Sequence, residues 1–116
     1  PGATGVQFIA QSVPVTMVRG QAYNVSVTVK NTGVSQWTAA RNYRLGAQTG
    51  QNDGQWGVSR LYLSAGETVA SGQQKIFNFT VTAPATAGTY NFKWRMLQEN
   101  VEWFGDATPN VAVIVQ

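Results

Sequence analysis

The chain has 116 residues, of which eight are Lys or Arg and five are Asp or Glu, and its formal net charge is +3. It contains neither cysteine nor histidine, which excludes disulfides, thiolate metal sites and histidine-based catalytic triads. The basic residues are scattered and no apolar run approaches the ~20 residues of a membrane span, so we expect neither nucleic acid nor a membrane as a partner.

The N-terminal segment is predicted to lead from a linker into a first, broken strand. Residues 1–5 read as a linker remnant, and residues 6–116 as one domain. Within that domain, 6–10 and 13–18 form the first strand, interrupted at Pro14 because proline has no amide N–H to donate to a sheet.

The middle of the chain continues with short strands. Residues 23–29 alternate apolar and polar side chains without error and stop at an Asn-Thr-Gly turn. A loop carrying Trp37 leads to a strand at 42–46, and a segment rich in Gly, Gln, Asn and Asp covers 46–55. The next predicted strand is 58–63.

The C-terminal part is predicted to contain strands at 76–82, 89–97 and 111–115. Tyr90, after a glycine at the start of its strand, also fits a tyrosine corner, in which the phenol bonds back to the chain. Seven or eight short strands at intervals near ten residues, with no helical period, predict an all-β, antiparallel sandwich of the immunoglobulin or fibronectin type.

Strand parity assigns most aromatic rings to the core. Tyr90, Phe92 and Trp94 alternate with polar side chains and share a face with Met96. The same argument buries the rings at Tyr23, Tyr43, Phe77 and Phe79. These rings are expected to stabilise the fold, and the remaining tryptophans need another explanation.

One group of rings lies near the predicted strand 58–63. Leu61 and Leu63 define its buried face, so a strand that is regular from residue 56 would point Trp56, Arg60 and Tyr62 outward together. Alternatively, Trp56 folds over a sheet edge and Tyr62 lies at the rim.

The direction of Trp103 depends on a hairpin register. A three-residue loop at 98–100, with its asparagine left-handed, places Trp103 opposite Arg95 in solvent and buries Phe104. A two-residue turn would instead pair Met96 with Trp103 and reverse both rings. We favour the first register because asparagine tolerates positive φ and glutamate does not.

The strands 42–46, 58–63 and 89–97 are adjacent in this topology, so their outer faces are expected to form one surface. Exposed rings flanked by guanidinium and amide groups suit the apolar face and hydroxyls of a pyranose. Trp37 more often plugs the end of a sandwich than binds, but it is kept as a further candidate. The predicted ligand-binding residues are Trp56, Tyr62, Trp103, Arg60, Arg95, Arg44 and Trp37.

Several motifs resemble the four-tryptophan, next-to-BRCA1 central-domain-like immunoglobulin family. The motifs are Lys30-Asn31-Thr32-Gly33 with Trp37, Asn42 to Gly46, Thr82-Ala83-Pro84, Gly88-Thr89-Tyr90, Trp94-Arg95-Met96 and Trp103-Phe104-Gly105. Eukaryotic members of the family sit in autophagy cargo receptors and bind peptides or proteins. Bacterial relatives look like accessory modules of secreted polysaccharide-degrading enzymes, and the 91–96 and 101–106 segments are closer to this bacterial type. The resemblance therefore implies a secreted bacterial protein, a signal segment outside this sequence and a covalently linked catalytic domain.

The leading functional expectation is a non-catalytic carbohydrate-binding module for β-linked oligo- and polysaccharides, in particular cello-oligosaccharides, mixed-linkage β-glucan and xyloglucan. The alternative is a protein-interaction or spacer module with its tryptophans packed at strand ends. A glycosidase is disfavoured because Glu99 and Glu102 flank a hairpin tip that cannot enclose a sugar. No cofactor or metal is expected, since Asn52-Asp53-Gly54 supplies only one carboxylate.

Overall fold

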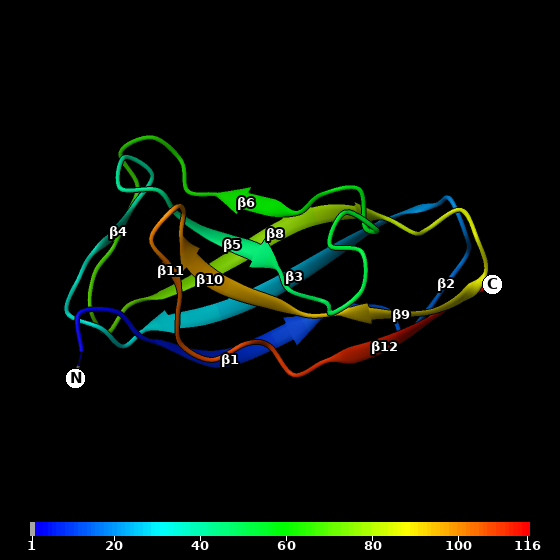
Figure 1. Cartoon of the computed structure of the whole chain (residues 1–116), viewed down its shortest axis with the longest axis horizontal. Coiled ribbons are helices and arrows are strands. Elements are labelled where there is room, and N and C mark those ends of the chain that lie inside the picture. Colours follow the sequence, from blue (N-terminus) through cyan, green and yellow to red (C-terminus); the bar gives the residue numbers. More distant parts are fainter. Residues whose placement is uncertain (1) are drawn as a thin grey trace.

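Strands and the turns between them make up the chain in the computed structural model, which describes residues 2–116 (Figure 1). One layer is a three-stranded antiparallel sheet in the order β1-β3-β8. Its strands are β1 (Val6–Ser12), β3 (Ala22–Asn31) and β8 (Gln74–Thr82). No helix in residues 2–116 is long and apolar enough to cross a membrane.

The facing layer contains two sheets that share one nearly continuous strand. Only Lys93 separates the end of β9 from the start of β10. The first sheet has the order β11-β10-β5-β6 and comprises β11 (Glu102–Trp103), β10 (Trp94–Gln98), β5 (Tyr43–Ala47) and β6 (Arg60–Tyr62). The second has the order β2-β12-β9 and comprises β2 (Thr16–Met17), β12 (Val111–Val115) and β9 (Gly88–Phe92). A short pair, β4 (Trp37–Thr38) and β7 (Thr68–Val69), completes the predicted sandwich.

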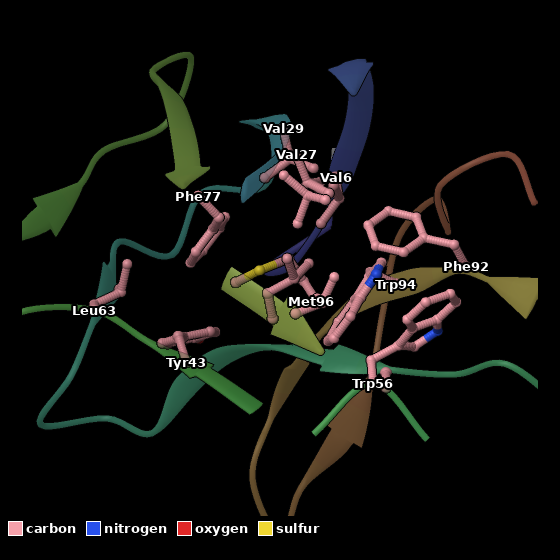
Figure 2. Packing of buried hydrophobic residues seen from close by; sticks show 14 of the residues in the cluster. Val6, Val27, Val29, Tyr43, Trp56, Leu63, Phe77, Phe92, Trp94 and Met96 are labelled. Carbon is pink, nitrogen blue, oxygen red and sulfur yellow. The ribbon is translucent and has the colours of Figure 1, made fainter. Parts of the chain in front are cut away.

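The core between the layers follows the predicted parity. Phe92, Trp94 and Met96 have no solvent-exposed surface, and Figure 2 shows them gathered with Tyr43 and Phe77. The aromatic rings of this core pack mainly edge to face. The ring centroids of Phe92 and Trp94, for example, are 5.7 Å apart. Tyr23, Phe79 and Tyr90 are half-buried and pack against this cluster.

The tyrosine corner is present. The Tyr90 hydroxyl donates a hydrogen bond of 2.7 Å to the carbonyl of Thr86, four residues upstream. This bond ties the turn before β9 to the strand itself.

Trp37 and Trp56 are both fully buried, so the expectation that they line a binding surface is wrong. Trp37 lies in β4 with its ring against Phe104, which is the plug role. Trp56 turns inward because the chain before β6 is not a strand. Gln55 and Gly57 donate backbone hydrogen bonds within successive turns, and Gly57 has a φ of 81°. The alternation that starts at Arg60 therefore does not extend back to residue 56.

Trp56 instead closes an edge of the sandwich. Its indole N–H donates 2.9 Å to the carbonyl of Asn91, and its own carbonyl accepts from the amide of Thr82 at 2.9 Å. The residue thus connects β8 in one layer to β9 in the other. This position is close to the alternative prediction that Trp56 folds over a sheet edge.

The predicted linker 1–5 is hydrogen-bonded to the domain where it is described. Gly2, Ala3 and Gly5 accept backbone hydrogen bonds from the turn at 32–35. Pro1 lies outside the described residues. Residues 2–5 are therefore attached to the turn that follows β3.

Candidate ligand-binding face

The outer face of the β11-β10-β5-β6 sheet brings together five of the seven candidate residues. In one row of neighbours across the sheet, Trp103 pairs with Leu97, Leu97 with Arg44, and Arg44 with Tyr62. In the next row, Arg95 pairs with Gly46 and Gly46 with Arg60. We call this surface the Trp103 face; its members are Arg44, Gly46, Arg60, Tyr62, Arg95, Leu97 and Trp103.

In the hairpin that carries Trp103, the side chains point to the predicted sides of the sheet, but the strands pair in a different register. Asn100 has a φ of 66°, and Phe104 is buried, as predicted. Trp103 lies opposite Leu97 rather than Arg95. The strand runs one residue further than predicted because Gln98 still pairs with Tyr43 in β5. The predicted pairing was wrong by one residue on each strand. Because both strands are displaced together, each side chain still points to its predicted face of the sheet.

The Trp103 ring extends across β10 as far as β5. A Cβ added to Gly46 would lie 2.8 Å from Trp103 Cη2 and 2.9 Å from Leu97 Cδ2, so the indole occupies the space that any other residue at 46 would fill. Leu97 is only 2% exposed although it is on an outer face. Trp103, itself half-buried, therefore covers an apolar side chain and depends on a glycine two strands away.

Two arginines and one glutamate hold the rings of this face in place. Arg60 lies over the Trp103 ring with Cζ 5.0 Å from its centroid, and Arg44 over the Tyr62 ring at 4.8 Å. Both guanidiniums donate to the same oxygen of Glu99, from Arg60 Nε at 3.0 Å and from Arg44 Nη1 at 3.1 Å. Cations and aromatic rings thus alternate across the sheet, with one anion between the cations.

The same contacts define the ionisation of Glu99. The hydrogen bond from Arg60 lowers the pKa of this carboxyl most strongly, desolvation opposes it to a smaller extent, and the hydrogen bond from Arg44 lowers the pKa further. A glycosidase acid needs a raised pKa so that it holds a proton near neutral pH. Glu99 is therefore a structural anion that positions two arginines.

A shallow hollow of about 300 Å³ adjoins the indole at the β10–β11 hairpin. Trp103, Leu97 and Val101 supply its apolar lining, and Tyr62 lies outside it. Its polar lining consists of Gln98, Glu99, Asn100 and Glu102. The indole thus has amide N–H groups beside it that can donate hydrogen bonds to hydroxyls. The amide and carboxylate oxygens can accept hydrogen bonds from hydroxyls.

The single carboxylate of the 49–53 loop is occupied by that loop. Asp53 Oδ1 accepts from the backbone amide of Thr49 at 2.9 Å and from its hydroxyl at 3.0 Å. Within residues 2–116 there is no group of three acidic side chains that could hold a metal ion.

Sequence reasoning missed two members of the Trp103 face and the glutamate that holds its arginines. Leu97 and Gly46 have no binding chemistry of their own, and Glu99 was considered only as a catalytic acid. A glycine inside a predicted strand does signal a close approach of another group, and Gly46 in the run 42–46 carried that signal.

The sandwich and its tyrosine corner agree with the comparisons with known proteins. Residues 14–116 match the family described as "Ig-like domain from next to BRCA1 gene". The chain belongs to this family. The Ig-like domain is also similar to the solution NMR structure of a CARDB domain from Pyrococcus furiosus, with a TM-score of 0.64 and 14% sequence identity over 97% of this chain and 94% of that one. At that identity the likeness concerns the fold alone. A search of curated proteins gave no significant match.

Proposed function

We propose that this Ig-like domain is a non-catalytic carbohydrate-binding module and that its Trp103 face holds one β-linked glycan chain. The observation that carries the proposal is the placement of Trp103. Its indole lies across an open sheet face and is fixed by Gly46 beneath its edge and by the Arg60 guanidinium. A ring that is already immobilised loses little conformational entropy when a sugar stacks on it.

The surrounding groups suit a pyranose. Sugar C–H groups pack on aromatic rings, while the hydroxyls at the edge of the sugar need donors and acceptors. Arg44, Arg60 and the amides of Gln98 and Asn100 lie within the same face or the adjoining hollow. Tyr62, 63% exposed at the opposite rim, offers a second ring.

Because Trp37 and Trp56 are buried, Trp103 and Tyr62 are the candidate rings that remain in the proposed site. Two rings on one sheet face suit a single glycan chain better than the flat surface of a crystalline polymer, which needs a longer row of platforms. The proposed role of the module is to hold a linked, secreted glycoside hydrolase at its polysaccharide.

Affinity gel electrophoresis and isothermal titration test the proposal on the intact domain. The ligand panel contains cellohexaose, mixed-linkage β-glucan, xyloglucan and β-linked acidic polysaccharide. At least one ligand should retard the protein and release heat, and Trp103→Ala should weaken that binding about ten-fold or more, since one stacking ring contributes on the order of 1 to 3 kcal/mol.

The matched control is Ile76→Ala, which removes an exposed apolar side chain from β8 in the other layer. Its affinity should equal that of the wild type. Absence of heat and retardation across the whole panel would refute the saccharide proposal.

The second candidate is a protein-interaction or spacer module. The burial of Trp37 and Trp56 is what this alternative expects of tryptophans packed at strand ends. It predicts that the Trp103 fluorescence, isolated as the difference between wild type and Trp103→Phe, does not change with any sugar. A saturable change with a glycan would exclude it as the sole function.

A further inference from the structure

We infer that the glycan bound on the Trp103 face is acidic, with a carboxylate on its sugar units that is held by Arg60 and Arg95. This inference rests on the proposed function and specifies its ligand class. A neutral glucan is the competing ligand class at the same face.

The charge of the face is unbalanced. Arg44, Arg60 and Arg95 place three guanidiniums on it, and Glu99 is the one carboxylate bonded to them. The Trp103 face itself therefore has a surplus of two positive charges, and the further carboxylate near the indole, Glu102, lines the adjoining hollow. In a chain with only eight basic residues, this concentration is a strong local feature.

Three of the four other acidic side chains have contacts away from these arginines, and the fourth, Asp106, forms no ion pair within residues 2–116 although it follows Gly105, whose carbonyl accepts from Arg95. Glu67 pairs with Lys75 at 2.6 Å, and Asp53 closes its own loop. Glu102 follows the opposite parity to Trp103 in β11, and its carboxylate accepts from the Thr4 hydroxyl at 3.5 Å. No ion pair with Arg95 occurs among residues 2–116.

Donors on these arginines remain available to a ligand. Arg60 uses Nε for Glu99 and Nη1 for the carbonyl of Ser59, and Arg95 uses Nε for the carbonyl of Gly105. Within residues 2–116 this leaves Nη2 of Arg60 and both terminal nitrogens of Arg95 without a protein acceptor. Charge-assisted bonds from a guanidinium to a carboxylate are roughly twice as strong as bonds between neutral groups.

The register places these donors around the ring. Arg95 and Arg60 both pair with Gly46, from opposite sides, so their backbones are two strand spacings or roughly 10 Å apart. The edge of Trp103 lies above the same glycine. A sugar that stacks on the part of the indole left open by Arg60 therefore lies near the guanidiniums of both Arg60 and Arg95, which can bind a substituent on its ring.

The test compares one polymer with and without its charge. The ligands are soluble poly-β-mannuronate and the same polymer with its carboxyl groups reduced to alcohols, titrated into the intact domain at ~150 mM salt. We expect about ten-fold or tighter binding of the acidic form, because each charge-assisted bond that is lost corresponds to roughly that factor.

Three variants test whether the preference for the acidic polymer arises at the Trp103 face. Arg95→Gln should weaken binding of the acidic polymer about ten-fold and so bring its affinity close to that of the reduced polymer. Trp103→Ala should weaken both. Arg19→Gln, which removes an exposed arginine from the turn before β3, should change neither.

Three results would count against the inference, and each is distinct. Equal affinity for the acidic and reduced polymers would overturn it while leaving saccharide binding intact. Failure of every glycan to bind would remove the proposed function as well. Binding of single-stranded DNA as tightly as the acidic glycan, without any effect of Trp103→Ala, would show a nonspecific attraction for polyanions and overturn the inference.

Discussion

At the scale of single residues, Trp56 and Trp103 have opposite roles. Trp56 closes the sandwich edge through its bond to Asn91, whereas Trp103 covers Leu97 on an outer face. Sequence parity could not separate them, since both follow polar segments rich in turns. The difference comes from the direction in which each loop returns to its sheet.

Trp56→Phe should destabilise the fold without affecting ligand binding. Loss of the indole hydrogen bond and of part of the buried ring should lower the free energy of unfolding by roughly 1–3 kcal/mol. Urea denaturation measures the stability, and isothermal titration measures the affinity. An unchanged stability together with weaker glycan binding would contradict this prediction and show that Trp56 contributes to ligand binding.

Glu99→Gln should reduce stability at neutral pH and make that loss disappear in acid. Because Arg60 and Arg44 lower the pKa of folded Glu99 below its ordinary value of 4.5, its charge stabilises the fold above that value. The contribution fades as pH falls through the lowered pKa. For a partly exposed pair we expect at most about 1 kcal/mol.

The control for this pH dependence is Glu67→Gln. A hydrogen bond from Lys75 lowers the pKa of Glu67 too, so both variants should lose stability at pH 7. Only Glu99→Gln should also weaken binding of the uncharged, reduced polymer, since Glu99 positions Arg44 and Arg60 beside the rings. Equal ligand affinity in both variants would contradict the positioning role.

At the scale of elements, the close approach of the Trp103 ring of β11 to the backbone of β5 depends on Gly46. Gly46→Ala should weaken glycan binding several-fold, because the new methyl group would displace Trp103 Cη2 and Arg60 Nη1, at 2.8 and 2.9 Å. Isothermal titration measures the effect. Gly88→Ala in β9 is the control, since its methyl group would meet no atom closer than 3.5 Å. Similar affinities in the two variants would show that the Trp103 position is unimportant.

Most elements of the fold were predictable, because long strands repeat a simple pattern. Residues 23–29 alternate strictly and form the central part of β3, and residues 77–82 alternate and form the C-terminal part of β8. The prediction failed between residues 56 and 59, where consecutive turns and the positive φ of Gly57 reset the parity before β6 begins at Arg60. It also placed Trp103 opposite the wrong residue, since loop length alone does not determine where pairing resumes.

At the scale of the whole molecule, the two outer faces of the sandwich differ in chemistry. The face of β3 and β8 pairs Asn24 with Thr80 and Ser26 with Asn78, and it carries hydroxyls and amides. The Trp103 face carries guanidiniums and rings. This asymmetry follows from residues that are scattered in sequence, so composition alone could not reveal it.

The central claim is that the Trp103 face contacts a sugar chain. The most direct measurement is a two-dimensional ¹H–¹⁵N NMR titration of the intact domain with a soluble β-linked oligosaccharide that binds in the panel. The claim predicts that the indole signal of Trp103 and the amides of 44–46, 60–62 and 95–97 shift together, while the indoles of Trp37 and Trp56 stay in place. Shifts confined to the β1-β3-β8 layer, or no shifts at a saturating ligand concentration, would contradict it.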